Sequence, residues 1–138
     1  PVLGPIGNRT TSEDTPLVIN LNITDVDSVL NCSTSLTAGS TNTTLVPVVN
    51  VLFGGTAPNC TATVTPVANG NGTTDLTFTV TDSGMPILTD FETFTFTVNG
   101  INDPPILSLI GNQSVNEDNN LNIAFTITDV DSVLNCNT

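Results

Sequence analysis

Apolar and polar residues alternate with a period of two along much of the chain, the pattern of β-strands with one buried face. The alternation is clearest over residues 17–24, 60–65, 76–81 and 93–98. Threonine fills the polar positions of the last three segments, and its branched side chain suits the exposed face of a sheet. No segment has the spacing of an amphipathic helix. We therefore expect an all-β chain.

Turn-forming residues separate the alternating segments, at Gly54-Gly55, at residues 69–72 and at Ser83-Gly84. About seven short strands in about 100 residues, with turns between them, are typical of a β-sandwich. We expect this fold.

The end of the chain repeats its beginning at an offset of 104 residues. Residues 23–32 and 127–136 both read ITDVDSVLNC, and 20 of the 34 positions shared by residues 1–34 and 105–138 are identical. This predicts a complete repeat in residues 1–104 and the first strands of a second, identical-type repeat in residues 105–138. Two strands cannot bury their apolar faces alone. The expected partners are therefore other copies of the repeat, either in tandem downstream or by strand exchange with a neighbouring chain.

Charge excludes several functions. Only 10% of residues are charged, with 13 acidic residues against the single cation Arg9, and the chain has no Lys, His, Trp or Tyr. One arginine cannot neutralise a nucleic-acid backbone, and histidine-based or Schiff-base catalysis lacks its residues. Asp90 and Glu92 lie in a threonine-rich strand, where we read them as a solvated face. We expect no enzyme and no nucleic-acid partner.

The chain has three cysteines, Cys32, Cys60 and Cys136, which are informative about its cellular location. A disulfide between Cys32 and Cys60 would close a loop of 28 residues and contribute roughly 3 kcal/mol on the chain-entropy estimate. Cys136 corresponds to Cys32 in the repeat, so its partner is expected beyond residue 138. Buried free thiols are the alternative. The composition and the cysteines favour an extracellular or cell-surface location. The longest apolar stretches, such as residues 106–110, are far shorter than the ~20 residues of a membrane span, so we expect no membrane insertion in this segment.

Seven asparagines satisfy the N-x-S/T pattern of N-glycosylation. They are Asn8, Asn22, Asn31, Asn42, Asn59, Asn71 and Asn112. Glycans at these sites would hydrate a surface that carries few charges.

Three segments carry a resemblance: SEDTPLVINLNITDVDS at 12–28, VTPVANGNGTTDLTFTVTDSG at 64–84 and FTVNGINDPPIL at 96–107. Together they resemble the tandem cadherin-like, immunoglobulin-like repeats of large prokaryotic cell-surface proteins. The resemblance implies an immunoglobulin-like or cadherin-like β-sandwich that recurs along an extracellular stalk, fibre or filament.

The same resemblance implies calcium at the junctions between repeats, since calcium prefers six to eight oxygen ligands. One implied site combines Glu13, Asn102, Asp103, Asp129 and Asp131. A second combines Asp25, Asp27 and Asp82 with a preceding linker. The linker GINDPP lacks one acidic residue of the cadherin pattern, and the mid-domain DRE motif is absent. The alternative is that these aspartates cap turns through hydrogen bonds to the backbone.

The sequence thus favours a structural repeat unit of an extracellular fibre, stalk or surface filament, stabilised by a disulfide and by calcium or glycans. The alternative is a stalk segment of a calcium-dependent adhesin. Recognition patches are usually rich in Tyr, Trp and Arg, and this chain has one Arg and neither of the others. An adhesive surface would therefore lie elsewhere in such a protein.

Overall fold

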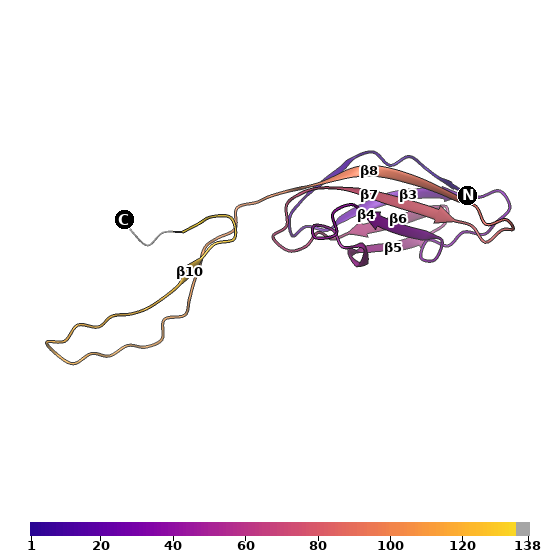
Figure 1. Ribbon diagram of the computed structural model, residues 1–138. Coiled ribbons are helices and arrows are strands. Elements are labelled where there is room, and N and C mark those ends of the chain that lie inside the picture. Colours follow the sequence, from indigo (N-terminus) through magenta and orange to yellow (C-terminus); the bar gives the residue numbers. More distant parts are fainter. Residues whose placement is uncertain (135–138) are drawn as a thin grey trace. The chain divides into compact units, whose positions relative to one another are not determined.

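The computed structural model describes residues 1–134 and divides the chain into two compact units, Pro1–Ile101 and Asn102–Thr138 (Figure 1). We call them the first unit and the second unit and describe each by itself.

The first unit is a β-sandwich of two four-stranded sheets. One sheet has the order β1-β3-β6-β5 and the other the order β2-β8-β7-β4. The strands are β1 (Val2–Leu3), β2 (Arg9–Ser12), β3 (Leu17–Thr24), β4 (Leu36–Ser40), β5 (Val51–Thr56), β6 (Asn59–Val64), β7 (Gly72–Thr81) and β8 (Thr89–Asn99), with a short 3-10 helix η1 (Val48–Asn50) before β5. The prediction of an all-β sandwich is confirmed.

The predicted alternation places the core between the sheets. Leu76, Phe78 and Val80 of β7 are fully buried, as are Ala62 and Val64 of β6 on the facing sheet. The Phe78 ring meets the rings of Phe53 and Phe94 edge-on, with centroids 5.2 Å apart in each case. Such edge-to-face pairs add about 0.5–1.5 kcal/mol each beyond the area that they bury.

Threonines line the outer face of the β7–β8 ribbon, as expected. Thr77 and Thr93 are register partners, and their hydroxyls lie 2.8 Å apart. Asp90 is not simply part of a solvated face, however. It is half-buried, and its Oδ2 accepts a hydrogen bond from the Leu3 N–H at 2.8 Å. Asp90 therefore fastens β1 to the opposite sheet.

The prediction of a turn at Gly54-Gly55 is wrong. Both glycines lie inside β5, where they pair with Thr61 and Cys60 of β6, and the chain reverses at Ala57-Pro58 instead. Gly55 has φ +92, and a Cβ there would lie 2.7 Å from the Asn59 carbonyl oxygen. The glycine thus serves a close approach between strands rather than a turn.

The N-terminal and C-terminal strands of one sheet pair in parallel. β2 runs beside β8 from the pair Arg9–Phe96 to the pair Ser12–Asn99. The Glu13 N–H extends this ladder by donating to the Asn99 carbonyl at 2.9 Å.

The second unit contains two short strands, β9 (Ile106–Leu107) and β10 (Ile127–Thr128). They pair antiparallel, with Ile106 opposite Thr128 and Leu107 opposite Ile127. All the other described residues of this unit lie outside strands and helices.

Candidate cation site and disulfide

Two aspartates converge on a positive charge at one end of the first unit. Asp25 follows β3, and its Oδ2 lies 2.7 Å from the ammonium nitrogen of Pro1. Asp82 follows β7, and its Oδ2 lies 3.9 Å from the same nitrogen. Both carboxylate side chains are more than nine-tenths buried. The same pocket is also lined by Val2, Thr24, Val26, Asp27 and Leu88.

The other oxygen of each aspartate caps a turn. Asp25 Oδ1 accepts the N–H groups of Asp27 and Ser28 at 3.0 and 2.8 Å. Asp82 Oδ1 accepts those of Gly84 and Leu88 at 3.2 and 2.9 Å. These bonds fix the carboxylate planes, so each Oδ2 is held toward the ammonium group.

The third aspartate of the predicted set, Asp27, interacts with Asp25. A side-chain hydrogen bond to Asp25 and the charge of that carboxylate raise the pKa of Asp27. The hydrogen bond to the Pro1 ammonium, together with the backbone N–H of Asp27, holds the pKa of Asp25 well below its usual range. The bond to Asp25 in turn raises the pKa of the ammonium above its ordinary value of 8.0.

Glu13, assigned to the other predicted calcium site, lies in the first unit. It is buried, and its Oε1 accepts a short hydrogen bond from the Ile101 N–H. Its own N–H donates to Asn99. These contacts fasten the segment after β2 to the end of β8.

The remaining residues of that predicted site lie in the second unit. Asp131 Oδ2 accepts the Asp103 N–H at 2.6 Å, so two of them are in contact. Asp129 Oδ1 accepts the N–H groups of Asp131 and Ser132 at 2.9 and 2.7 Å, as Asp25 does in the first unit. The Asn102 side-chain amide donates to the Asp103 carbonyl at 3.1 Å.

Turn capping, the alternative from the sequence, is therefore present at Asp25, Asp82 and Asp129. Within residues 1–134 no group of three or more His, Cys, Asp or Glu side chains is arranged to hold a metal ion. The two carboxylate oxygens that do not cap a turn, Asp25 Oδ2 and Asp82 Oδ2, face the Pro1 nitrogen. Calcium stays a prediction.

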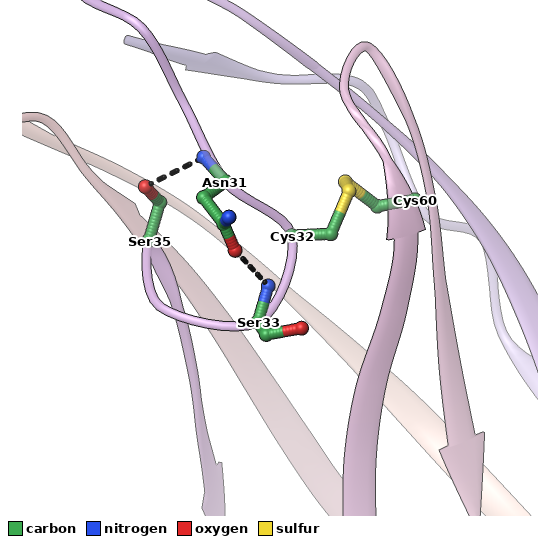
Figure 2. Close-up of a disulfide and its surroundings, with 5 residues drawn as sticks. All are labelled: Asn31, Cys32, Ser33, Ser35 and Cys60. Atoms are coloured by element: carbon green, nitrogen blue, oxygen red, sulfur yellow. Dashed lines mark hydrogen bonds between the residues drawn. A yellow bond between two sulfur atoms is a disulfide. The ribbon is translucent and has the colours of Figure 1, made fainter.

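The predicted disulfide joins Cys32 to Cys60 (Figure 2). Cys32 lies in the segment that passes from β3 to the other sheet, and Cys60 is the second residue of β6. The Cα atoms are 5.5 Å apart, and both residues are 2% exposed. A tight turn presents Cys32, because Asn31 accepts the Ser33 N–H at 2.9 Å through Oδ1 and donates its own N–H to Ser35 Oγ at 3.1 Å. Cys136 lies outside the described residues.

Six of the seven predicted glycosylation asparagines are exposed, and Asn42 is half-buried. Asn22 and Asn59 are register partners on the outer face of β3 and β6. The side chain of Asn8 already makes a hydrogen bond, since its Oδ1 accepts the Thr95 N–H at 3.1 Å. Asn42 Oδ1 likewise accepts the hydroxyl of Thr44 at 2.7 Å. The glycans remain predictions.

The sequence patterns missed one participant, Asp90. No motif marks Asp90, because its partner Leu3 lies 87 residues away in the chain. Compared with known protein families, curated proteins and solved structures, the chain matches none. Over the described residues, none of the helices has the length and apolar character to span a bilayer.

Proposed function

We propose that this chain is a structural repeat unit of an extracellular fibre, stalk or surface filament, with an immunoglobulin-like or cadherin-like sandwich as its building block. The observation that carries the proposal is the parallel pairing of β2 with β8. These are the strands nearest to the two ends of the first unit that share a sheet.

Tension between the ends of the first unit would load this pair in shear. The pulling force acts on the N-terminal end of β2 and on the C-terminal end of β8. Because the strands are parallel, the force runs along both of them in opposite senses. The hydrogen bonds of the four register pairs, and the Glu13–Asn99 bond beyond them, are then loaded together rather than one by one. This arrangement suits a part that bears load.

The Cys32–Cys60 disulfide supports the same role. It encloses β4, η1 and β5, so these elements stay tied to β6 even when the rest of the unit is pulled apart. Disulfides persist in oxidising compartments, which agrees with an extracellular location.

The proposed function includes calcium binding. At the pocket of Asp25 and Asp82 the capping oxygens and the cation-facing oxygens are different atoms. Turn capping and cation binding are therefore compatible at one carboxylate. Calcium would bind to Asp25 and Asp82, with the neighbouring Asp27 adding charge. A stalk segment of a calcium-dependent adhesin is the second candidate, and this pocket is the observation that favours it.

The test is single-molecule pulling on the first unit from its two ends, with paired proline substitutions in β2. Along a strand, alternate N–H groups point the same way, so the Arg9 N–H shares the direction of the Glu13 N–H, toward β8. The Thr10 N–H points away. We expect Arg9→Pro to lower the unfolding force clearly and Thr10→Pro, the matched control, to change it little.

A first unit that extends without a distinct force peak would contradict the load-bearing role. Equal effects of the two prolines would contradict the assignment of the load to the β2–β8 ladder. Electron microscopy of the native material then separates the candidates. Long filaments indicate a fibre subunit, whereas isolated rods with a distinct tip indicate an adhesin stalk.

A further inference from the structure

The second unit presents an apolar face with no cover among the described residues. Its exposed large apolar residues are Ile106, Leu107, Leu109, Ile110, Val115, Leu121, Ile123, Phe125, Val130, Val133 and Leu134. So many apolar side chains in so short a segment are unusual on a soluble surface.

The backbone of this unit nonetheless follows the first 30 residues of the chain closely. The pairs Val2–Thr24 and Leu3–Ile23 of β1 and β3 recur as Ile106–Thr128 and Leu107–Ile127. The Gly4 N–H donates to Asn22 at 2.8 Å, and the equivalent Ser108 N–H donates to Thr126 at the same distance.

Finer details recur as well. Asp14 has φ 57 and its equivalent Asp118 has φ 59, an uncommon conformation for a residue other than glycine. The turn capped by Asp25 has its counterpart at Asp129. The second unit therefore adopts the local geometry of the start of a sandwich.

Burial differs sharply at the positions whose equivalents form the core of the first unit, whereas Ile106, Val130 and Val133 have equivalents that are also exposed there, Val2, Val26 and Val29. Leu3 and Ile19 are 3% and 1% exposed in the first unit, whereas Leu107 and Ile123 are 53% and 40% exposed in the second. Leu21 is 4% exposed, and its equivalent Phe125 is 49% exposed. In the first unit these side chains belong to one core with residues of β4, β6, β7 and β8.

We propose that the apolar face of the second unit is the docking surface for a second copy of the strand set that β4–β8 forms in the first unit. The occupant is identified by the interface that the same sequence already makes in the first unit. There, β3 pairs with β6 from Leu17–Val64 to Asn22–Asn59, and its inward side chains meet the core of β7 and β8. The identity of the partner rests on the proposed function as a repeat unit.

Docking would extend the sheet as well as cover the core. Residues 121–126 are the equivalents of residues 17–22, the part of β3 that pairs with β6, and they form no strand in the second unit. An incoming equivalent of β6 would complete this pairing. Residues 113–116, the equivalents of β2, would likewise pair with an incoming β8.

The experiment extends the chain after Thr138 by a second copy of residues 35–101, which continues the 104-residue repeat, and measures hydrogen exchange of residues 105–134. In the 138-residue chain we expect these amides to exchange almost without protection. In the extended chain we expect protection to rise by roughly 10³-fold or more, the lower end of what a folded domain gives. A non-reducing peptide map should also join Cys136 to the appended cysteine that corresponds to Cys60.

Two variants of the extended chain test the face itself. Ile123→Asp places a charge on the docking face and should abolish the gain in protection. Asn122→Asp adds the same charge at the neighbouring outward position and should leave it intact. Unchanged exchange of residues 105–134, or equal effects of the two variants, would overturn the proposal.

The same hydrogen-exchange measurement on the 138-residue chain at high concentration tests whether the second copy comes from a neighbouring chain. Dimers or longer oligomers with protected residues 105–134 would show that the second copy comes from a neighbouring chain, which supports the docking surface equally. Failure of the docking surface leaves the pulling result on the first unit unaffected. Failure of the load-bearing role leaves the exchange result unaffected.

Discussion

The Cys32–Cys60 disulfide should set how far the first unit extends under force. The bond joins residues 28 positions apart, and it is fully buried. A fully extended chain spans at most about 3.6 Å per residue. With the bond intact, this loop contributes only the 5.5 Å between the two Cα atoms. Reducing the bond should therefore lengthen the unfolded unit by about 95 Å.

The assay is single-molecule pulling of the first unit with and without reductant, read as the gain in contour length at unfolding. The variant Cys32→Ala combined with Cys60→Ala should reproduce the longer extension without reductant. The same loss of the cross-link should lower the free energy of unfolding by roughly 3 to 4 kcal/mol on the chain-entropy estimate. For a domain of this size that loss lowers the melting temperature by about 15 °C or more.

An unchanged contour length after reduction would refute this reasoning. It would mean that the two cysteines are not joined, and alkylation of both in the folded protein would show the same. A longer extension with no loss of stability would keep the bond but remove its stabilising role.

Three further predictions concern the core and the cation pocket. Phe78→Ala should cost about 3–5 kcal/mol of unfolding free energy in a urea titration because it removes a fully buried ring, whereas Phe91→Ala, at a side chain 63% exposed, should cost less than about 1 kcal/mol. For a 138-residue chain with a free N-terminus at Pro1, the lowered pKa of Asp25 and the raised pKa of the Pro1 ammonium predict highest stability at intermediate pH. The stabilising contribution of the Asp25 carboxylate is lost as the pH falls below its ordinary pKa of 3.8, and that of the ammonium is lost as the pH rises above its ordinary pKa of 8.0. Urea midpoints at pH 3, 7 and 10 measure both losses. Equal midpoints in the chain with and without N-terminal acetylation would contradict the ion pair. Calcium should raise the melting temperature of the acetylated chain, which lacks the competing ammonium charge, and Asp82→Asn should abolish this shift; no response to calcium or to a chelator would leave the aspartates as turn caps.

The sequence was sufficient for features that repeat every two residues or recur every 104. Alternation located β3, β6, β7 and β8 because an inward side chain must be apolar at each second position, as Leu76, Phe78 and Val80 are. It failed at Gly54-Gly55, where glycine serves a close backbone approach inside a strand. From composition alone, that use cannot be told from a turn.

The contacts between distant segments could not be predicted. The Leu3–Asp90 hydrogen bond and the parallel pairing of β2 with β8 join residues 87 positions apart, and neither has a local signature. The disulfide was predictable only because two cysteines were available in the complete repeat. The convergence of Asp25 and Asp82 was suggested by the resemblance, but the role of each oxygen comes from the structure alone.

The recurrence of local geometry without burial separates two contributions to this fold. The second unit has the pairing, the capped aspartate turn and the left-handed Asp118 of the first, so these features follow from the sequence of about 30 residues. Burial does not recur, because the core requires β4–β8 on the other side. Local hydrogen bonds therefore specify how the segment is shaped, whereas burial of its apolar side chains requires further strands. The proposed docking of a second β4–β8 set would supply those strands, and the segment would already have the shape that this docking needs.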